Sequence, residues 1–538
     1  SGRFRIAGSD FDTAESNLIV TQSGTTIPVP FAGSGIRPIG QPLADSEGNI
    51  IPGLGYFAAD VFGRGGFSSL SLGGNVEFQG PVSISADNVL RVATGGVIRA
   101  DSAVNLFAHY ASLGQAFMEP QLPGATIQLF TKTVNGVLST FSFPPAPGTG
   151  SLSVVADHID IGTLSLQGIG ETSFVARRGD IRGNGTLQVA GSLGLTAAQI
   201  YPTTGSSFNI VAYDSDAAPG SITIGGSGSA AVPLSGGGSL NLFASEIVQG
   251  GTLRAPFGSI QLGWDGSGTA PFLNPVAGNS TSLPVTQMLT LTEGSQTSVA
   301  AVDPRTGQGV LIPYGYVRDG ESWIAPNGED ITAVGPPEKS ISLGGQTVVT
   351  ADGSLVDVRG GGELFGYQFI PGTGGSTDAL ASTSSFAIVP GYDPDFSPYA
   401  PFNRAADTFG GDTGYRNDNL TTGDQIYLSA NHGLPVGNYT LLPARYALLP
   451  GAWLISPQTG APVGSFASPD GSFIVSGYRH NTVDPGTESA IQKRWELAPG
   501  SVVRERSRYA EFGGDLFFAA AAESLNIDVA RLPMDSGR

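Results

Sequence analysis

The chain has no cysteine among its 538 residues. This absence excludes a disulfide framework, a thiolate metal site and a cysteine nucleophile. Lysine is also scarce, since it occurs only as Lys132, Lys339 and Lys493. With so few lysine side chains, Schiff-base chemistry and a lysine-based phosphate site are not expected. A long secreted bacterial β-protein can do without disulfides if its core is continuous, whereas a small secreted module cannot.

Charge and long hydrophobic runs are limited as well. Charged residues make up 13% of the chain, and the net charge is −19. Binding of nucleic acid or anionic lipid requires a basic surface, so we expect neither partner. No run of 18 apolar residues occurs, so no segment is expected to span a bilayer as a helix. The chain begins with Ser1 instead of an initiator methionine. We therefore expect a processed N-terminus or a segment of a longer protein.

Glycine and short β-runs are what the sequence has in abundance. There are 79 glycines without a strict three-residue period, which excludes collagen. The hydrophobic content of 40% is enough for a packed core. Residues 150–262 contain short β-runs that begin about 20 residues apart, a spacing typical of a solenoid. These runs are 152–155, 174–176, 193–195, 208–211, 222–224, 240–243 and 260–262.

This repeat predicts an all-β fold, a parallel β-helix in which each coil pairs with the coils above and below it. Inward-facing apolar residues would form ladders, and glycine would occupy the corners. A β-sandwich of this size would need several cores with linkers between them, and no linker-like change in composition occurs. We assign residues 1–362 to the parallel β-helix.

Two segments are expected to interrupt the β-helical repeat. Residues 115–149 break the repeat, and Asn135-Gly136 between two β-runs is typical of a type I′ hairpin turn. Residues 363–500 are rich in aromatic side chains and predict an excursion or a β-rich subdomain.

The C-terminal part carries two further predictions. Thr487–Ala498 is a helix candidate, with possible caps at its start and Pro499-Gly500 at its end. Residues 501–538 are expected to return to β-helix rungs, including 515–518 and 525–529. No polar cap follows these rungs, so we expect a slice of a longer protein or an open end that docks onto another copy.

Three phrases resemble a known family. Residues 150–168 resemble the rungs of filamentous haemagglutinin-like bacterial exoproteins. Residues 364–375 and 433–453 resemble segments of very large haemagglutinin-like outer-membrane proteins of Gram-negative bacteria. The resemblance implies a right-handed parallel β-helix that is exported through an outer-membrane partner and then secreted or displayed at the cell surface. It further implies adhesion, aggregation and extracellular fibre formation. The Asn-Pro-Asn motifs of the family's secretion domain are not found in this sequence.

Arg178-Gly179-Asp180 is an integrin-type tripeptide and a candidate recognition site. Gly179 and Asp180 also fit a corner between two rungs, because turns favour these residue types. The turn is the interpretation we expect. Trp453, within the aromatic-rich block, is a second candidate for recognition of sugar or protein. A place in the core of the excursion is the interpretation we favour.

Metal chemistry is not expected, and no cofactor is predicted. The four histidines, His109, His158, His432 and His480, have no partner at ligand spacing. His158 lies in an alternating run and is expected to face solvent. Asp393 and Asp395 lack the glycine and glutamate of a calcium loop, so turn capping is the better interpretation.

One group of charged residues could carry catalysis. Asp157, Asp160 and Asp180 fall in neighbouring coils, with Arg177 and Arg182 nearby. Carboxylates clustered on successive coils could cleave polysaccharide. The alternative, which we expect, is a solvated outer face without catalytic residues.

The sequence thus predicts a structural or adhesive protein without catalysis, which forms or extends an extracellular fibre. The expected partners are further copies of the chain, a host-cell, bacterial or glycan receptor, and an outer-membrane export partner. A carbohydrate-active enzyme on a β-helix scaffold is the alternative. A segment that only spaces a distal binding tip is a third hypothesis.

Overall fold

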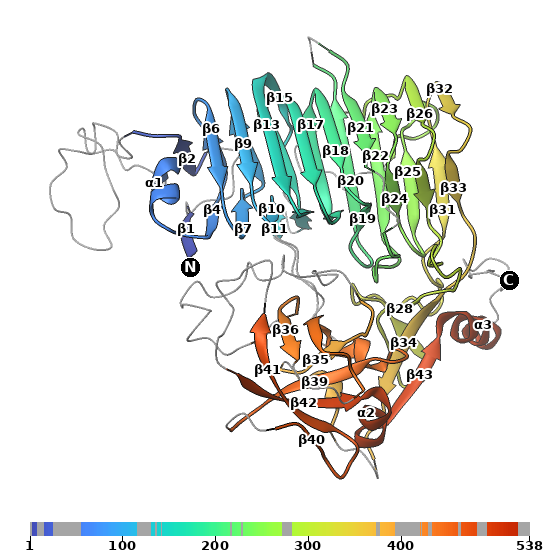
Figure 1. Ribbon diagram of the computed structural model, residues 1–538. Helices are drawn as coiled ribbons and strands as arrows, with labels where there is room; N and C mark the ends of the chain where they lie inside the picture. The colour runs from blue at the N-terminus through green and yellow to red at the C-terminus, as the bar shows by residue number, and fades with distance from the viewer. Residues whose placement is uncertain are drawn as a thin grey trace.

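The computed structural model describes an all-β protein with large parallel sheets, an arrangement compatible with a β-helix or solenoid (Figure 1). The residues that it describes are 3–7, 16–24, 55–115, 131–134, 137–140, 143–215, 218–226, 230–271, 282–372, 377–382, 384–392, 420, 422–428, 433–460, 464–480 and 492–525.

Three parallel sheets make up the first part of the chain, which we call the parallel body. Every strand pair within them is parallel, and neighbouring strands follow the order of the sequence except at the start of the second sheet, where β2 lies between β3 and β5. The first sheet contains, in order, β1 (Arg3–Ala7), β4 (Ser69–Gly73), β7 (Val89–Val92), β10 (Tyr110–Leu113), β14 (His158–Ile161), β16 (Ile181–Gly183), β19 (Ile200–Pro202), β24 (Thr252–Arg254), β27 (Gln296–Ser298) and β33 (Leu355–Asp357).

The second and third sheets share β15 (Leu164–Ala176), whose first half belongs to one sheet and whose second half belongs to the other. The second sheet contains β3 (Gly55–Ala58), β2 (Leu18–Thr21), β5 (Val76–Phe78), β8 (Val97–Ala100), β15, β17 (Gly185–Ala190), β20 (Ser207–Tyr213), β22 (Ser239–Ala244), β25 (Ser259–Leu262) and β31 (Ser340–Leu343). The third contains β6 (Val82–Ser85), β9 (Ala103–Phe107), β13 (Ala146–Ala156), β15, β18 (Ser192–Thr196), β21 (Ser221–Gly225), β23 (Glu246–Gln249), β26 (Met288–Leu291) and β32 (Thr347–Thr350).

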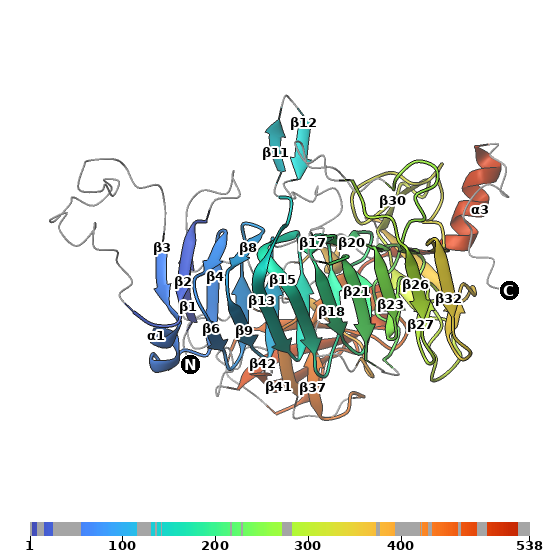
Figure 2. The same ribbon diagram turned by 90° about the horizontal axis from the view of Figure 1, so that it is seen from above.

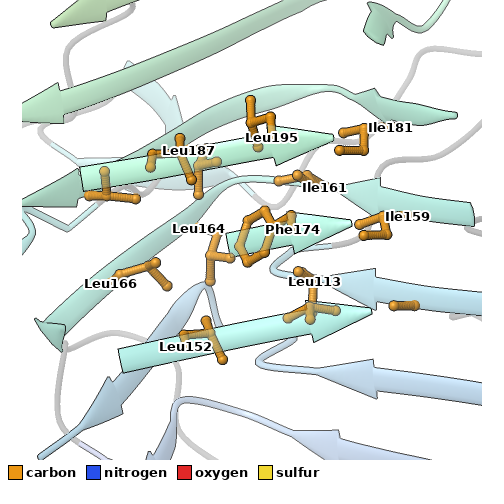
Figure 3. Packing of buried hydrophobic residues seen from close by; sticks show 14 of the residues in the cluster. Leu113, Leu152, Ile159, Ile161, Leu164, Leu166, Phe174, Ile181, Leu187 and Leu195 are labelled. Carbon is orange, nitrogen blue, oxygen red and sulfur yellow. The ribbon is translucent and has the colours of Figure 1, made fainter. Parts of the chain in front are cut away.

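The core of the parallel body is built from ladders of apolar side chains. In the third sheet Leu106, Val154, Phe174, Leu195 and Ile224 are paired in register from strand to strand, and all five are buried. Side chains from all three sheets point into this common interior (Figure 3). The alternation of apolar and polar residues in the sequence therefore separates an inner from an outer face in each strand.

Glycine closes the corners where successive rungs approach each other. Gly191, just before β18, has a φ of 113°, and a Cβ there would collide with the carbonyl oxygen of Gly170. Gly294 also has a positive φ, of 78°, but open space surrounds it.

We predict that Gly191→Ala lowers the free energy of unfolding by about 2–4 kcal/mol, since a strained φ and a backbone clash act together. Gly294→Ala is the matched control, and it should cost about 1–2 kcal/mol because only the φ term applies. Urea unfolding followed by far-UV circular dichroism measures both variants. Equal losses in the two variants would contradict the proposed contact between rungs.

The N-terminal end of the parallel body carries a short helix, α1 (Ala59–Arg64). Its Ala59 and Phe62 are buried in the same core cluster as the ladders, and the Phe62 ring stacks on Phe67. In Figure 1, α1 lies at the end opposite to β31, β32 and β33, and Figure 2 shows it opposite to β32. This helix therefore covers core residues at the first rungs.

The predicted hairpin is present as β11 (Thr131–Val134) and β12 (Val137–Thr140), which pair antiparallel with Val134 opposite Val137. Asn135-Gly136 itself lies outside the described residues. Figure 2 shows the two strands standing away from the parallel sheets.

A second unit, which we call the antiparallel body, lies beside the parallel body (Figure 1). Its sheet contains β37 (Gly437–Thr440), β36 (Gln425–Leu428), β41 (Phe473–His480), β42 (Lys493–Pro499), β39 (Trp453–Gln458), β35 (Phe386–Ile388) and β38 (Leu442–Pro443), and β40 (Phe466–Ala467) pairs with β41. Helix α2 (Gly500–Arg506) and 3-10 turns at Ala379–Ala381 and Ala444–Leu448 accompany it.

The helix expected at Thr487–Ala498 is wrong where the structure describes it. Residues 493–499 form β42, a strand that pairs with both β39 and β41. Trp495 and Leu497 are buried two residues apart, which is strand spacing. In the sequence, Ile491 and Trp495 are also four residues apart, a spacing that favours a helix face. Pairing on both sides of β42 instead satisfies the backbone as a strand.

Smaller elements join the two bodies. One sheet contains β28 (Leu311–Pro313), β34 (Glu363–Phe369) and β43 (Tyr509–Gly513), and a separate antiparallel pair contains β29 (Tyr316–Arg318) and β30 (Ser322–Ile324). The chain then forms helix α3 (Gly514–Ser524).

The return to β-helix rungs at 501–538 is also wrong for the described residues. Residues 515–518, expected as a rung, lie in α3. The alanine run 519–522 favours helix, and Phe517 and Phe518 lie four residues before Ala521 and Ala522 on the buried side. Residues 526–529 lie outside the described residues.

Candidate functional site

The outer face of the first sheet carries a buried polar cluster. Strand alternation points Ile159 and Ile161 of β14 into the core, so His158 and Asp160 point to the other side. The parallel register places Asp160 next to Arg182 of β16, and Arg182 next to Tyr201 of β19. Three successive rungs therefore stack a carboxylate, a guanidinium and a phenol on one face.

Asp160 and Arg182 form a two-pronged ion pair. Nε of Arg182 donates to Oδ1 of Asp160 at 2.5 Å, and Nη2 donates to Oδ2 at 2.9 Å. The hydroxyl of Tyr110 in β10 donates to the same Oδ2 at 2.7 Å. The side chains of Asp160 and Arg182 are fully buried. The expected solvated outer face is therefore wrong for these two residues.

His158 adds a further contact to Asp160. The backbone N–H of Asp180 donates to Nδ1 of His158 at 3.4 Å, so the ring proton lies on Nε2. Nε2 is 3.1 Å from Oδ1 of Asp160 and donates to it. His158 is buried and its ring stacks on Tyr110, so the expectation that it faces solvent is wrong.

Burial and pairing set the protonation of this cluster. Burial alone would raise the pKa of Asp160, but Arg182 and His158 outweigh it and hold this pKa well below its usual range. Burial disfavours a charged Arg182, but Asp160 raises the pKa of Arg182 above its ordinary value. Burial raises the pKa of both Tyr110 and Tyr201 well above the usual value. The pair is thus ionised and the two phenols are neutral.

Asp180 behaves in the opposite way. Its carboxylate accepts from Nε2 of Gln199 at 3.1 Å, but burial raises its pKa in spite of the nearby His158. Ionised Asp180 therefore costs folding free energy, whereas ionised Asp160 contributes to it.

We predict that Asp180→Asn stabilises the protein at neutral pH, by about 0.5–1.5 kcal/mol, because the amide oxygen still accepts from Gln199 without a partly buried charge. The gain should vanish at about pH 3, below the unfolded-state pKa of about 3.9, where Asp180 is protonated in both states. Urea unfolding at pH 3 and at pH 7 measures this. A gain that persisted unchanged at pH 3 would contradict a partly buried, ionisable Asp180.

The β19 end of the cluster is bonded to the segment 230–238, which in turn contacts the antiparallel body. Nε2 of Gln199 donates to the carbonyl of Ala231 at 3.2 Å, and Oγ of Ser235 donates to the carbonyl of Pro202 at 2.9 Å. On its other side, the same segment accepts from the hydroxyl of Tyr446, at the carbonyl of Leu234, at 3.2 Å. The antiparallel body thus reaches the outer face of the first sheet through this segment.

A second charged group, around Asp157, lies at the corner next to the cluster. Nδ1 of His109 is 2.6 Å from Oδ2 of Asp157, Arg177 is 3.1 Å from Oδ1, and Arg178 is 3.4 Å from Oδ2. A Cβ at Gly179 would lie 2.9 Å from the carbonyl oxygen of Asp157. The carboxylate of Asp157 is thus surrounded by cationic and imidazole groups.

The tripeptide Arg178-Gly179-Asp180 is part of this corner. The Arg178 side chain contacts Asp157, the N–H of Gly179 donates to the carbonyl of Asp157 at 2.8 Å, and the Asp180 carboxylate is bonded to Gln199. All three residues take part in contacts between rungs. This geometry matches the corner-turn interpretation.

Trp453, the other recognition candidate, lies at the start of β39. It is partly buried, packs against one of the cores of the antiparallel body, and its ring centroid is 5.9 Å from that of Phe473. His480 belongs to β41, opposite Gln425, and nothing is described of its side chain. His432, Asp393 and Asp395 lie outside the described residues.

The sequence predicted one group of charged residues, and the structure places its members in two groups. The members are Asp157, Asp160, Asp180, Arg177 and Arg182. Tyr110, Gln199 and Tyr201 were missed. The alternation of polar and apolar residues that placed His158 and Asp160 on an outer face also applies to β10 and β19, and it could have found Tyr110 and Tyr201. Nothing in the sequence signalled that a distant segment would cover this face.

The arrangement favours a structural role for the cluster over chemistry on a substrate. Asp160 is enclosed, and its oxygens already accept from Arg182, Tyr110 and His158. Within the described ranges, no three acidic, histidine or cysteine side chains gather where they could hold a metal ion.

In the same ranges, no helix has the length and hydropathy needed to cross a membrane.

Comparison with known proteins gave no match: no family model matches the chain, and neither a curated protein nor a solved structure is significantly similar to it. The resemblance to filamentous haemagglutinin-like exoproteins stays a prediction from the sequence.

Proposed function

We propose that this chain is a non-catalytic rod of a secreted or surface-displayed adhesive protein of a Gram-negative bacterium. In this proposal the parallel body is a right-handed parallel β-helix of the filamentous haemagglutinin-like type. The rod forms or extends an extracellular fibre and presents its surface to a host-cell, bacterial or glycan receptor. An outer-membrane partner exports it.

The continuity of the parallel register is the observation that carries the proposal. The first sheet runs through ten strands, each from a later repeat, with one apolar interior alongside. At about 4.8 Å per strand this ladder extends over roughly 45 Å. Coils stacked in this way give a long surface of constant cross-section, which suits a spacer or an adhesive better than a substrate pocket.

The alternative, a polysaccharide-cleaving enzyme, requires a pair of carboxylates that reach the scissile bond from either side. Asp160 is fully buried and ion-paired, and Asp157 lies within ion-pair distance of His109 and two arginines. Neither carboxylate is placed as a free acid or nucleophile, and this supports the non-catalytic proposal.

The proposal is tested by adhesion and hydrolysis assays on the same preparation. Beads coated with the folded chain are expected to bind epithelial cells, bacterial cells or a glycan array, whereas beads coated with the heat-unfolded chain should not. Polysaccharides incubated with the soluble chain should release no new reducing or unsaturated ends. Release of such ends, lost in Asp157→Asn, would overturn the proposal in favour of the enzyme, and absence of binding to all three surfaces would also overturn it.

A further inference from the structure

The last rung of the parallel body, which we call the open rung, consists of β31, β32 and β33. The pairings described for these strands lie on one side only, with β25, β26 and β27 of the rung before. Burial changes abruptly at this point. Leu289 of β26 is fully buried, whereas Val348, its partner in β32, is 41% exposed. The open rung therefore exposes side chains that continue the ladders of the core.

The third sheet also carries a column of outward-facing side chains, which we call the outer column, and its last member is exposed at the open rung. Val248, Thr290 and Val349 follow each other in register, and Val349 is 45% exposed. In the first sheet Leu355 and Val356 of β33 are 43% and 40% exposed. Exposed edges of monomeric proteins usually carry lysine, proline or another charge that prevents strand addition. The strands β31 and β32 contain none of these residues.

The charge of the open rung favours a second copy of this chain as the occupant. A net charge of −19 makes copies repel each other over most of their surface. The only charged residue in the three strands is Asp357, and Arg359 neutralises it at 2.9 Å. The strands of two open rungs can therefore meet without like charges in contact, and Asp352, exposed in the turn between β32 and β33, is the one other charged residue of 340–358.

The opposite end of the parallel body determines how the copies meet. Helix α1 packs onto the core there, so the first rungs do not offer the same bare core. A head-to-tail stack would require an open rung to dock on this covered end, whereas a head-to-head contact joins two uncovered ends. An isologous contact of this kind closes as a dimer with two-fold symmetry.

We propose that the open rung pairs with the open rung of a second copy and forms a head-to-head dimer. If a two-fold axis runs normal to the third sheet, the two β32 strands are antiparallel. The core-facing sides of this sheet in the two copies then lie on the same side of the joined sheet. Directly opposite residues then share a face, so the register is centred on Val348 or on Val349. Residues 340–358 supply about 20 residues per copy, near the lower end of a standard interface.

Analytical ultracentrifugation tests this pairing. The wild-type chain is expected to be dimeric at about 10–100 μM, and Val349→Lys should raise the dimer dissociation constant by at least about tenfold, because it places two lysines at the edge contact. Val248→Lys is the matched control, since it lies in the same outer column but inside the sheet and is 36% exposed. A monomeric wild-type chain at these concentrations, or a Val349→Lys variant that associates like the wild type, would overturn the proposal.

The absence of cysteine makes cross-linking decisive about orientation, because any introduced thiol is unique. With a short bis-maleimide, Val349→Cys should cross-link to itself. Val61→Cys on α1, which is 46% exposed, should not. A cross-linked product that forms only when the two variants are mixed would show head-to-tail stacking and overturn the dimer.

This inference goes beyond the proposed function. The dimer occupies the open rung of both copies, so a fibre would have to grow through other surfaces of the chain, and the two proposals can fail separately. A chain that binds cells but stays monomeric would leave the adhesive proposal standing and remove the dimer. A dimer that binds no surface would do the reverse.

Discussion

Asp160→Asn is expected to lower the free energy of unfolding of the parallel body by about 3–5 kcal/mol, the usual cost of breaking a buried ion pair from one side. The substitution keeps the shape of the side chain but leaves the Arg182 guanidinium buried without its carboxylate. It also weakens the acceptors for Tyr110 and His158. The expected loss is a large fraction of the stability of a typical domain.

Urea unfolding followed by far-UV circular dichroism measures the loss of stability. Hydrogen exchange of β10, β14 and β16 shows whether the loss occurs in the strands that carry the cluster. Arg182→Met should cost a similar amount, and the double variant should cost clearly less than the sum of the two, because both charges are then absent. Arg64→Met is the control, since its ion pair with Asp60 is exposed and should be worth about 0.3–0.5 kcal/mol. An Asp160→Asn loss no larger than that of Arg64→Met would contradict the buried pair.

The pH dependence has a definite sign. Because the folded-state pKa of Asp160 is lowered, the pair contributes fully above the unfolded-state pKa of about 3.9 and is lost only as pH falls through the lowered folded value. The difference between the wild type and Asp160→Asn should therefore be constant from pH 7 to about pH 5 and narrow below about pH 4. Narrowing that began near neutral pH would point to another group.

The coil pattern was predictable from the sequence because it depends on local rules. Runs such as Phe208–Val211 and Leu240–Phe243 alternate inner and outer residues, and corner glycines such as Gly191 mark the turns between them. The parallel pairing of β20 with β22 follows once the spacing of the repeat is known. Each of these features needs only the neighbouring rung.

The buried cluster was not predictable in the same way, because its burial depends on a partner distant in sequence. Asp160 and Arg182 occupy outer positions, and an outer position in a solenoid faces solvent unless another part of the chain covers it. The cover involves Leu234, which accepts from Tyr446, more than 200 residues later in the chain. No local pattern encodes that contact.

The C-terminal part shows the same limit for secondary structure. Lys493–Pro499 is a strand because two neighbours pair with it, although its spacing suggested a helix. Residues 514–524 form a helix that buries Phe517 and Phe518, although short apolar runs suggested rungs. In both segments tertiary packing outweighs the local signal.

The packing of α3 depends on Trp323, a fully buried residue of β30. Its ring centroid is 5.3 Å from that of Phe517 and 5.1 Å from that of Phe518. Its Nε1 donates to the carbonyl of Tyr314 at 2.8 Å, and Gly366 of β34 approaches the same ring, which leaves no room for a side chain there. Trp323 thus joins the helix, the β29–β30 pair and β34 in one cluster.

Trp323→Ala is therefore expected to cost about 3–5 kcal/mol, because it leaves a large cavity and an unpaired carbonyl at Tyr314. The loss should be local, so that trypsin cleaves the variant after Arg508 much faster than it cleaves the wild type, while hydrogen exchange in β14 and β16 stays unchanged. Leu516→Ala in the same helix is the control, since Leu516 is 79% exposed and its loss should stay within about 0.5 kcal/mol. If α3 is as well protected in Trp323→Ala as in Leu516→Ala, the helix is held by something other than the tryptophan. Protection that falls equally in α3 and in the distant rungs would instead show that the two bodies unfold as one unit.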